Sequence, residues 1–424
     1  MRSRKIKMRQ GFKEMDNFKH RNDCRICGGS DFFKILDLGE MPPANAFLKK
    51  EDLDKPELKF PLVLYFCRKC GLVQLLDIVN PKVLFGGQYD YLTSASKPLV
   101  EHFREMAGEL VRKFVESQDD LALEIGGNDG TLLHEMKNRC RVLNIDPAVN
   151  MTELSQKRGV PSISRFFSSE TAEEILKEYG MAKVIVANNV TAHIDDIKDV
   201  FKGVEALLSD DGVFVFEAHW VGNLIGDGGF DQIYHEHLSY YSLTALKYLI
   251  GQFGLKIFDV ELVPVHGESL RVYVGKNREV GSEVGNFLTR EKEMGLDKEA
   301  AYADFSEKVL KNKKDAVGLL SDIKKNGKKI IGYGAPAKGN TLLNYFGITG
   351  ETLDFITDTT PTKQGLYTPG SHIPVYPPEK LFEAKPDYLL LLAWNYADAI
   401  IKKEAGFREK GGKFIIPVPE VKIV

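Results

Sequence analysis

Four cysteines form two pairs whose spacing is typical of a zinc site. Cys24 and Cys27 make one C-x2-C turn, and Cys67 and Cys70 make a second turn later in the chain. A tetrahedral zinc ion needs four ligands, and each turn can supply two thiolates. A redox C-x-x-C motif is the alternative, but it would not explain the second copy. Because all four ligands are protein atoms, the sequence predicts a structural zinc ion with no open position for chemistry.

A glycine-rich loop at 124–130 has the residue types of a cofactor site. The sequence LALEIGGNDG places Glu124 after a short apolar run and before the glycines, and a helix is predicted to begin near Thr131. This strand–loop–helix order is the first unit of a doubly wound sheet, whose ligand crevice lies at the carboxyl ends of the strands. The loop lacks the G-x-G-x-x-G pattern of pyrophosphate binders. Asn128 and Asp129 inside the turn favour a ligand that carries an ammonium group and no phosphate.

Further polar residues follow the ends of other predicted strands. Asp146 follows a strand at 141–145, where an acid can accept hydrogen bonds from ribose hydroxyls. Strands at 183–189 and 213–217 continue the alternation of strands and helices. These elements together resemble the class I S-adenosylmethionine fold. The residues expected to contact that cofactor are Glu124, Gly126, Asn128, Asp129, Gly130, Asp146, Phe167, Asn188 and Asn189.

The segment at 230–243 concentrates residues that can move protons. Its sequence, FDQIYHEHLSYYSL, places His235, Glu236 and His237 among several tyrosines, shortly after the fourth predicted strand. The two histidines could bind a metal, but their spacing does not match the helical H-E-x-x-H motif. A histidine in such a place is also compatible with a hydrogen-bonded structural role. The residue types alone therefore leave a base and a structural group as alternatives.

Several motifs in one order give the chain a resemblance to a known family. From Cys24 to the carboxyl terminus it resembles the sugar C-methyltransferases of branched-deoxysugar biosynthesis. The resemblance rests on CRICG, CRKCG, YDYLTSAS (89–96), EIGGNDGTLL (124–133), ANNVTAHIDD (187–196), DQIYHEHLSYYS (231–242) and GYGAPAKGNTLLNY (332–345). We therefore expect an α/β chain with a small zinc-binding domain, a class I methyltransferase domain that is Rossmann-like, and a second Rossmann-like domain at the carboxyl end.

The resemblance also implies the catalytic residues. It implies His237 as the base, with Tyr234 and Glu236 beside it, and a pocket tyrosine that is Tyr89 or Tyr91, with Tyr89 favoured. The implied reaction is methylation of a carbon next to the ketone of a nucleotide-linked 4-keto-deoxysugar, with C3 favoured over C5 and thymidine diphosphate as the nucleotide. A carbon next to a ketone can lose a proton to give an enolate. Histidine, with an ordinary pKa of ~6.5, can accept that proton at neutral pH, and tyrosine hydroxyls can stabilise the enolate.

A second strand–turn–helix pattern at 329–341 offers groups for a phosphate. Lys338 supplies a cation and the start of the helix supplies amides, which suit a diphosphate. The resemblance implies that this domain holds a nucleotide-diphosphate sugar against the middle domain. The alternative is a supporting domain in which Lys338 is a solvated charge. The residues expected at the substrate are Lys338, Gly334, Asn340, Thr341, His193 and Arg271.

Composition limits the remaining function classes. The 424 residues carry a net charge of -3, so no overall positive field would attract nucleic acid or an anionic membrane. The densest apolar run, at 388–394, is too short to span a bilayer. Five cysteines are too few for a disulfide scaffold, so we expect a reducing, cytoplasmic location. A monomer is the expected oligomeric state, and no membrane or nucleic-acid partner is expected. The alternatives in function are an O- or N-methyltransferase, which needs no proton removal from carbon, and a zinc-ribbon nucleic-acid adaptor.

The motifs also predict how the chain divides. The expected parts are a disordered tail at 1–20, a zinc-binding domain at 21–80, a methyltransferase domain at 81–275, a helical connector at 276–326 and a domain for the sugar nucleotide at 327–424.

Overall fold

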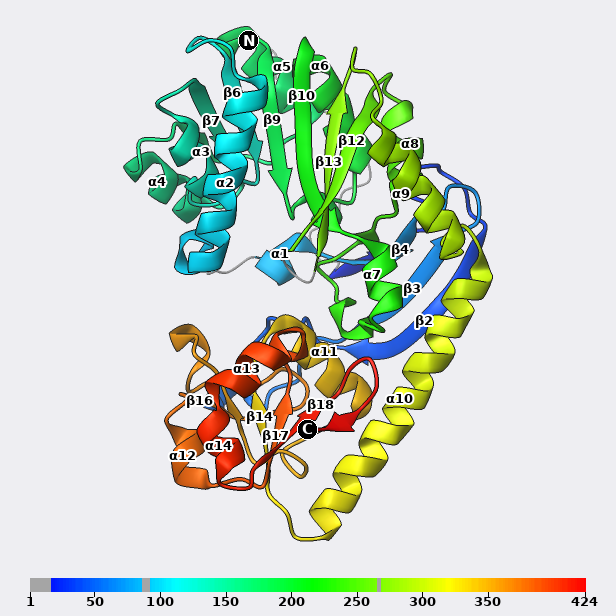
Figure 1. The fold of residues 1–424 in the computed structure, drawn as a ribbon, viewed down its shortest axis with the longest axis vertical. Helices are drawn as coiled ribbons and strands as arrows, with labels where there is room; N and C mark the ends of the chain where they lie inside the picture. Colours follow the sequence, from blue (N-terminus) through cyan, green and yellow to red (C-terminus); the bar gives the residue numbers. More distant parts are fainter. Residues whose placement is uncertain (1–16, 86–91, 265–267) are drawn as a thin grey trace.

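The computed structural model describes residues 17–85, 92–264 and 268–424. Figure 1 shows an upper lobe built on one large sheet, a lower lobe built on a second sheet, and a smaller curved sheet that lies beside both lobes. The long helix α10 (Glu299–Lys325) runs along the side of the molecule from the upper lobe to the lower lobe. Among the described helices, none combines the length and the apolar character needed to cross a bilayer.

The upper lobe contains a seven-stranded sheet in the order β12-β13-β10-β9-β6-β7-β8. The strands β6, β7, β8, β9 and β10 are parallel, whereas β13 runs antiparallel to β10 and β12 runs antiparallel to β13. The order reverses between β6 and β9, so a ligand crevice is expected at the carboxyl ends of these two strands. The predicted doubly wound sheet is confirmed. The bounds are β6 (Leu121–Ile125), β7 (Arg141–Ile145), β8 (Ser162–Ile163), β9 (Ala182–Asn188), β10 (Leu208–His219), β12 (Lys256–Val263) and β13 (Ser269–Gly275).

Helices cover both faces of this sheet because its strands are apolar on both sides. On one face, α2 and α3 pack on Ala122, Val184 and Val215. On the other face, α5, α6 and α8 pack on Leu123 and Phe214. The helical bounds in this lobe are α1 (Pro81–Phe85), α2 (Lys97–Phe114), α3 (Thr131–Met136), α4 (Val149–Lys157), α5 (Ser169–Tyr179), α6 (Ile197–Leu207), α7 (Val221–Gly226), α8 (Leu243–Gly251) and α9 (Ser282–Glu293), with short 3-10 turns η2 (Thr93–Ala95), η3 (Thr191–His193) and η4 (Phe230–Gln232).

The curved sheet combines the amino-terminal cysteine region with a strand from the middle of the chain. Its order is β11-β4-β3-β2, and all of its pairings are antiparallel. The strand β11 follows the YHEH sequence directly, and Ser239 pairs with Gln74 while Tyr240 pairs with Val73. The bounds are β2 (Phe32–Met41), β3 (Phe60–Cys67), β4 (Val73–Leu75) and β11 (Ser239–Tyr240), with a separate pair of β1 (Phe18–His20) and β5 (Asp77–Val79) and the turn η1 (Lys50–Asp52).

The lower lobe is a second Rossmann-like sheet, as the sequence predicted. Its order is β16-β15-β14-β17-β18-β19, parallel except for β19, so the strand order is that of a doubly wound dinucleotide-binding sheet. The strand bounds are β14 (Ile330–Tyr333), β15 (Ile356–Thr357), β16 (Val375–Tyr376), β17 (Tyr388–Leu391), β18 (Lys413–Ile416) and β19 (Lys422–Ile423). The helical bounds are α11 (Ala337–Phe346), η5 (Pro361–Lys363), α12 (Lys380–Ala384), η6 (Trp394–Tyr396), α13 (Ala397–Lys403) and α14 (Ala405–Glu409).

Candidate functional site

The four cysteines meet in one cluster that has the size of a tetrahedral zinc site. Their Sγ atoms all lie within 4.8 Å of one another, and the Cys24–Cys70 and Cys27–Cys67 pairs are each 3.5 Å apart. Four thiolates at the usual Zn–S distance lie about 3.8 Å from one another, so the cluster fits the ion. Hydrogen bonds from Cys67 and then Cys70 lower the pKa of Cys24, which favours a thiolate in the cluster. Gly28, at a positive φ of 67°, forms the turn that brings the first pair together.

Arg25, inside the first cysteine turn, connects the cluster to the segment after the YHEH sequence. Its side chain is fully buried. Its Nη1 donates to the carbonyl of Leu238 at 2.8 Å, and its Nη2 donates to the carbonyl of Leu75 at 2.9 Å. The amide of Leu75 donates to the same Leu238 carbonyl at 3.0 Å. The cysteine region therefore fixes the backbone that immediately follows His237.

The two histidines of the YHEH sequence have different surroundings. The Nε2 of His235 lies 3.2 Å from the carbonyl of Phe60, and its ring stands edge-on to the Phe60 ring. Burial lowers the pKa of His235 to about 4, so this ring is neutral at physiological pH. His235 therefore fastens the segment to β3 and is the structural histidine of the pair.

Among the described residues, the ring of His237 contacts the carbonyl of Gln232 and the hydroxyl of Tyr234. Its Nδ1 lies 3.2 Å from the carbonyl oxygen of Gln232, and its Nε2 lies 2.7 Å from the hydroxyl of Tyr234. A carbonyl oxygen can only accept, so Nδ1 carries the hydrogen and the neutral ring has its lone pair on Nε2. The rings of His193 and His219 have their centroids 5.1 Å from that of His237. The geometry thus presents a basic nitrogen beside a tyrosine hydroxyl.

Glu236 and His193 are hydrogen-bonded to each other next to His237. The Oε1 of Glu236 accepts from Asn45 Nδ2 at 2.7 Å, and burial raises the pKa of the carboxyl group. The backbone carbonyl of Glu236 accepts from His193 Nδ1 at 2.7 Å, and burial lowers the pKa of His193. The structure therefore brings together His237, Tyr234, Glu236 and His193, while Tyr89 and Tyr91 lie outside the described residues.

Glu124 is the buried acid at the switch point of the upper sheet. It is 3% exposed, and its Oε2 has no hydrogen-bond partner among the described residues. Burial raises its pKa to about 8, and repulsion from Asp146, Asp129 and Glu217 acts in the same direction. A side chain at Gly127 would begin 2.8 Å from that oxygen, so glycine is needed there. An unpaired buried carboxyl group of this kind fits a ligand that brings an ammonium group.

The loop after Glu124 is tied to the next strand and to the segment before α2. The Asn128 amide, at a positive φ of 51°, donates to Asp146 Oδ2 at 3.0 Å. The Asn128 side chain accepts from the amide of Thr93 at 3.0 Å. Burial raises the pKa of Asp146, whose second oxygen accepts from the amide of Ala148. The turn thus places Asp146 at the carboxyl edge beside Glu124.

The other expected cofactor residues divide into two groups. Asn188 and Asn189 end β9 at the same edge, and each has a buried Oδ1 with no hydrogen-bond partner among the described residues. In contrast, Asp129 is fully buried, pairs with Arg158 at 3.0 Å and anchors the start of α3. Phe167 lies in the core beneath α6. Its neighbour Phe166, which the sequence analysis missed, follows β8 and is 71% exposed.

Arg271 belongs to a buried charge network on β13, between the strands β12 and β10 of the upper sheet. Its guanidinium donates to Glu217 and contacts Glu261 and Glu109. His102 Nε2 lies 2.8 Å from the same Glu217 carboxylate, whose pKa is lowered chiefly by His102 and Arg271 against the opposing effect of burial. The guanidinium of Arg271 is therefore paired with carboxylates of the protein itself.

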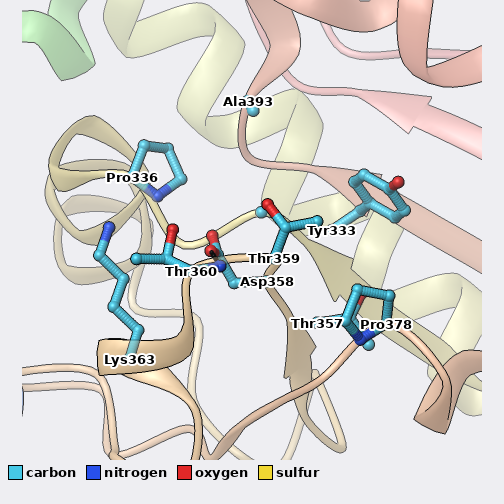
Figure 2. Close-up of a pocket in the computed structure, with 10 residues that line it drawn as sticks. Tyr333, Pro336, Thr357, Asp358, Thr359, Thr360, Lys363, Pro378 and Ala393 are labelled. Atoms are coloured by element: carbon cyan, nitrogen blue, oxygen red, sulfur yellow. Dashed lines mark hydrogen bonds between the residues drawn. The ribbon is translucent and has the colours of Figure 1, made fainter. Parts of the chain in front are cut away.

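The lower lobe has a cleft of about 270 Å³ at the carboxyl ends of β14 and β15. Figure 2 shows Tyr333, Asp358, Thr360 and Lys363 around it, with the Lys363 side chain pointing towards the β14–α11 loop. The amide of Ala335 donates to Asp358 at 2.6 Å, and Lys363 Nζ donates to the carbonyl of Ala335 at 2.8 Å. Burial lowers the pKa of Lys363. The cleft thus combines one acid with one cation.

Of the expected substrate residues in the lower lobe, only Gly334 lines this cleft. Lys338 instead bonds to Asn395 and lies 4.3 Å from the centre of the Trp394 ring. The side chain of Asn340 donates to the carbonyl of Ala44 at 2.7 Å, and Thr341 is buried beside it. The loop after β14 therefore lines the cleft through Gly334, whereas the side chains of Lys338 and Asn340 contact other groups of the protein.

Comparison with known proteins gives matches along most of the chain. Models described as "Putative zinc binding domain", "Methyltransferase domain" and "C-methyltransferase C-terminal domain" match residues 24–85, 100–260 and 264–419. The C-methyltransferase NovU from Streptomyces niveus is 37% identical over 407 residues, which are 95% of this chain and 97% of that protein. These matches confirm the predicted S-adenosylmethionine cofactor and the four-cysteine zinc domain.

Solved structures resemble part of the chain only distantly. Magnesium protoporphyrin IX methyltransferase from Synechocystis is 11% identical with a TM-score of 0.34, covering 42% of this chain and 83% of that one. The YcgJ protein from Bacillus subtilis is 14% identical with a TM-score of 0.31, covering 39% and 74%. Likeness at this level establishes nothing about activity.

Removal of zinc is expected to loosen the segment that carries His237. Chelation, or Cys70→Ser, would free the cysteine turns that hold β4, so amides at 72–76 and 238–241 should exchange with deuterium at least about tenfold faster. Hydrogen–deuterium exchange read by mass spectrometry measures this. The control is Cys140→Ser, which removes a buried free thiol outside the cluster. Equal exchange at 238–241 with and without metal would contradict the expectation.

Cofactor binding is expected to release a proton from Glu124. With a pKa of about 8, this carboxyl group is mostly protonated at pH 7, and an ammonium group beside it favours the ionised form. Binding of S-adenosylhomocysteine at pH 7 should therefore release close to one proton, and the release should vanish as pH rises well above 8, where the free protein is already ionised. Calorimetry in buffers of different ionisation enthalpy measures the release.

Variants test whether that proton comes from Glu124. Glu124→Gln keeps the shape of the side chain but cannot titrate, so its binding heat should not depend on the buffer. Glu153→Gln, which alters an exposed carboxylate on α4, should behave as the wild type. A wild-type binding heat that is the same in every buffer would show that Glu124 does not ionise on binding.

Proposed function

Because the chain belongs to the C-methyltransferase family, we propose that it methylates a carbon of a nucleotide-linked 4-keto-deoxysugar. The acceptor in this proposal is C3 of the sugar, and the nucleotide is thymidine diphosphate. The chain is an S-adenosylmethionine-dependent C-methyltransferase, and 37% identity to NovU over 95% of its length supports that coarser statement. One observation carries the finer proposal: the lone pair of His237 is fixed on Nε2, beside the hydroxyl of Tyr234.

In this proposal His237 removes the proton from the carbon next to the ketone. A ketone neighbour makes that proton removable, because the charge passes to the ketone oxygen as an enolate. Histidine alone is too weak a base, since every pKa unit of mismatch costs about 1.4 kcal/mol. The enolate must therefore be stabilised by a hydrogen-bond donor. Turning the Tyr234 hydroxyl from Nε2 to that oxygen would provide one, and one such donor is worth roughly 3 kcal/mol.

Residues at the carboxyl edge of the upper sheet would hold the cofactor. The unpaired Glu124 oxygen would accept from its ammonium group, and Asp146 would accept from its ribose hydroxyls. Phe166, exposed beside the end of β8, offers a face for the adenine that the buried Phe167 does not. Bound S-adenosylmethionine supplies a methyl group that is already electrophilic, so the protein has to align it with the carbon.

The sugar nucleotide would lie between the two lobes. Its diphosphate would be held by Lys338 and Lys363 from the lower lobe, while Glu236 and His193 would bind hydroxyls of the sugar. Asp231 belongs to the segment at 230–241 that carries Tyr234, Glu236 and His237, here called the catalytic segment. Lys338 is close enough to Asp231 for its charge to affect that acid. The expected boundaries of the domains, the pocket tyrosine at 89 or 91, a monomeric state and a cytoplasmic location remain proposals of the same kind.

Replacement of His237 is expected to abolish proton removal and to leave cofactor binding intact. His237→Asn removes the basic Nε2, so turnover should fall by about 100-fold or more. The measurement uses a thymidine diphosphate 4-keto-2,6-dideoxyhexose that carries deuterium at C3, next to the ketone. Loss of that deuterium to solvent is followed with S-adenosylhomocysteine bound. O- or N-methylation would need no such loss, so the measurement also separates these reactions.

The matched control for His237→Asn is His20→Asn. His20 pairs with Asp77 on the amino-terminal strand pair, so its loss should not change the rate of deuterium loss. Retention of wild-type deuterium loss in His237→Asn would overturn the assignment of the base. Binding of S-adenosylhomocysteine with unchanged affinity shows that the variant is folded.

A further inference from the structure

The short turn η4, just before the YHEH sequence, is held by the lower lobe. The ring of Phe230 lies 5.2 Å from that of Phe346 and 5.4 Å from that of Tyr345, both on α11. The next residue, Asp231, is fully buried, and its Oδ2 accepts from Trp394 Nε1 at 2.7 Å. One residue of the catalytic segment is therefore hydrogen-bonded directly to an indole of the lower lobe.

Asp231 stands next to the carbonyl that orients His237. The Gln232 carbonyl lies 3.2 Å from His237 Nδ1 and also accepts from the hydroxyl of Tyr240. The Gln232 amide donates to the carbonyl of Gly229 at 3.0 Å, and Asp231 directly precedes Gln232 in the turn η4. The indole of Trp394 thus holds Asp231, whose backbone continues into the peptide that orients the ring of the proposed base, and these groups form the path from the lower lobe to His237.

The orientation of the Gln232 carbonyl decides which nitrogen of His237 is basic. With the carbonyl in place, Nδ1 keeps the hydrogen and Nε2 keeps the lone pair. Without this acceptor, the tautomer that carries its hydrogen on Nε2 is no longer disfavoured. That tautomer would present an N–H, and not a lone pair, to the carbon that loses its proton. In serine proteases, loss of the group that fixes the tautomer lowers kcat by about 10⁴-fold.

We propose that Asp231 is a positioning residue through which the lower lobe holds His237 in its basic tautomer. The proposal rests on the proposed function of His237 as the base. It explains why a carboxylate is buried where the lobes meet, since an aspartate there is costly unless its hydrogen bonds have a role. It also gives Trp394 a function beyond packing.

Lys338 connects this path to the substrate. Its Nζ lies 4.3 Å from the centre of the Trp394 ring, and its charge acts on Asp231. A diphosphate that engages Lys338 would therefore bind against the same indole that holds Asp231. Binding of the diphosphate at Lys338 would then stabilise the arrangement in which His237 carries its hydrogen on Nδ1 and its lone pair on Nε2.

The test compares variants that break the path at different points. Trp394→Phe removes only the indole donor, and Asp231→Ala removes the acceptor, whereas Asp231→Asn keeps an oxygen that can accept from Trp394. In the full-length protein labelled with ¹⁵N-histidine, the His237 signals are identified by their loss in His237→Asn. The wild type should show the Nδ1–H tautomer, Trp394→Phe and Asp231→Ala should show a mixture, and Asp231→Asn should be largely restored.

Kinetics with the thymidine diphosphate 4-keto-2,6-dideoxyhexose supply a second measurement. For Trp394→Phe, kcat and the rate of deuterium loss should fall together by about tenfold or more, and KM should change by less than about threefold. Trp220→Phe is the matched control, because it breaks a buried indole–carboxylate bond of 2.8 Å to Glu291 outside this path. That variant should keep the wild-type tautomer and kcat.

Two results would overturn the proposal. One is a His237 tautomer in Trp394→Phe that matches the wild type. The other is a rise in KM alone, which would show that Trp394 binds substrate without orienting the base. The tautomer is measured without substrate, so it remains decisive even if His237→Asn keeps deuterium loss and the proposed function fails. If Asp231→Ala does not fold, the tautomer and the kinetics of Trp394→Phe are sufficient to test the proposal.

Discussion

The two-residue pairing of β11 with β4 is the constraint on which the candidate site depends. Strands of two and three residues are not stable by themselves, so this pairing must be fixed from outside. Arg25 fixes it, because a buried guanidinium is tolerated only where acceptors surround it. The carbonyls of Leu75 and Leu238, one from each side of the pairing, are such acceptors. A slip in register would separate the guanidinium from these two carbonyls, so the cysteine cluster that positions Arg25 also positions the segment with His237.

The segment at 230–241, which carries the proposed base, is consequently held at both of its ends. The zinc-binding sheet binds its end, at Leu238 and β11, whereas the lower lobe binds its beginning, at Phe230 and Asp231. Asn45 adds a contact to Glu236 from the amino-terminal region. The proposed base therefore lies where three parts of the chain meet, and we expect its orientation to depend on all three being docked. This arrangement explains why a methyltransferase domain carries a metal site that contributes no ligand to the chemistry.

The sequence predicted the features that depend on local spacing. The cysteine turns and the loop after Glu124 follow from spacing alone, and both lie where these patterns indicated. The pairing of β11 with β4 joins residues far apart in the chain, so no local pattern contains it. The sequence analysis named Phe167 for the cofactor, but Phe167 packs in the core and its neighbour Phe166 is exposed. Which of two adjacent aromatic residues is buried depends on packing between distant segments, so the sequence pattern does not reveal it. Lys338 was assigned by its charge, but a neighbouring indole sets the direction of its side chain.

Charge differs between the two lobes in a way that suits two different ligands. Burial and mutual repulsion raise the pKa of Glu124 to about 8, with Asp146 and Glu217 nearby, so the carboxyl edge of the upper sheet favours a cationic ligand. In the lower lobe, burial lowers the pKa of Lys338 and Lys363, so these side chains favour an anion such as a diphosphate. A cation bound near Glu124, or an anion bound near the two lysines, would offset the cost of burying those charges, whereas a ligand of the opposite charge would increase it. In the proposed function, this difference directs S-adenosylmethionine to the upper lobe and the sugar nucleotide to the lower lobe.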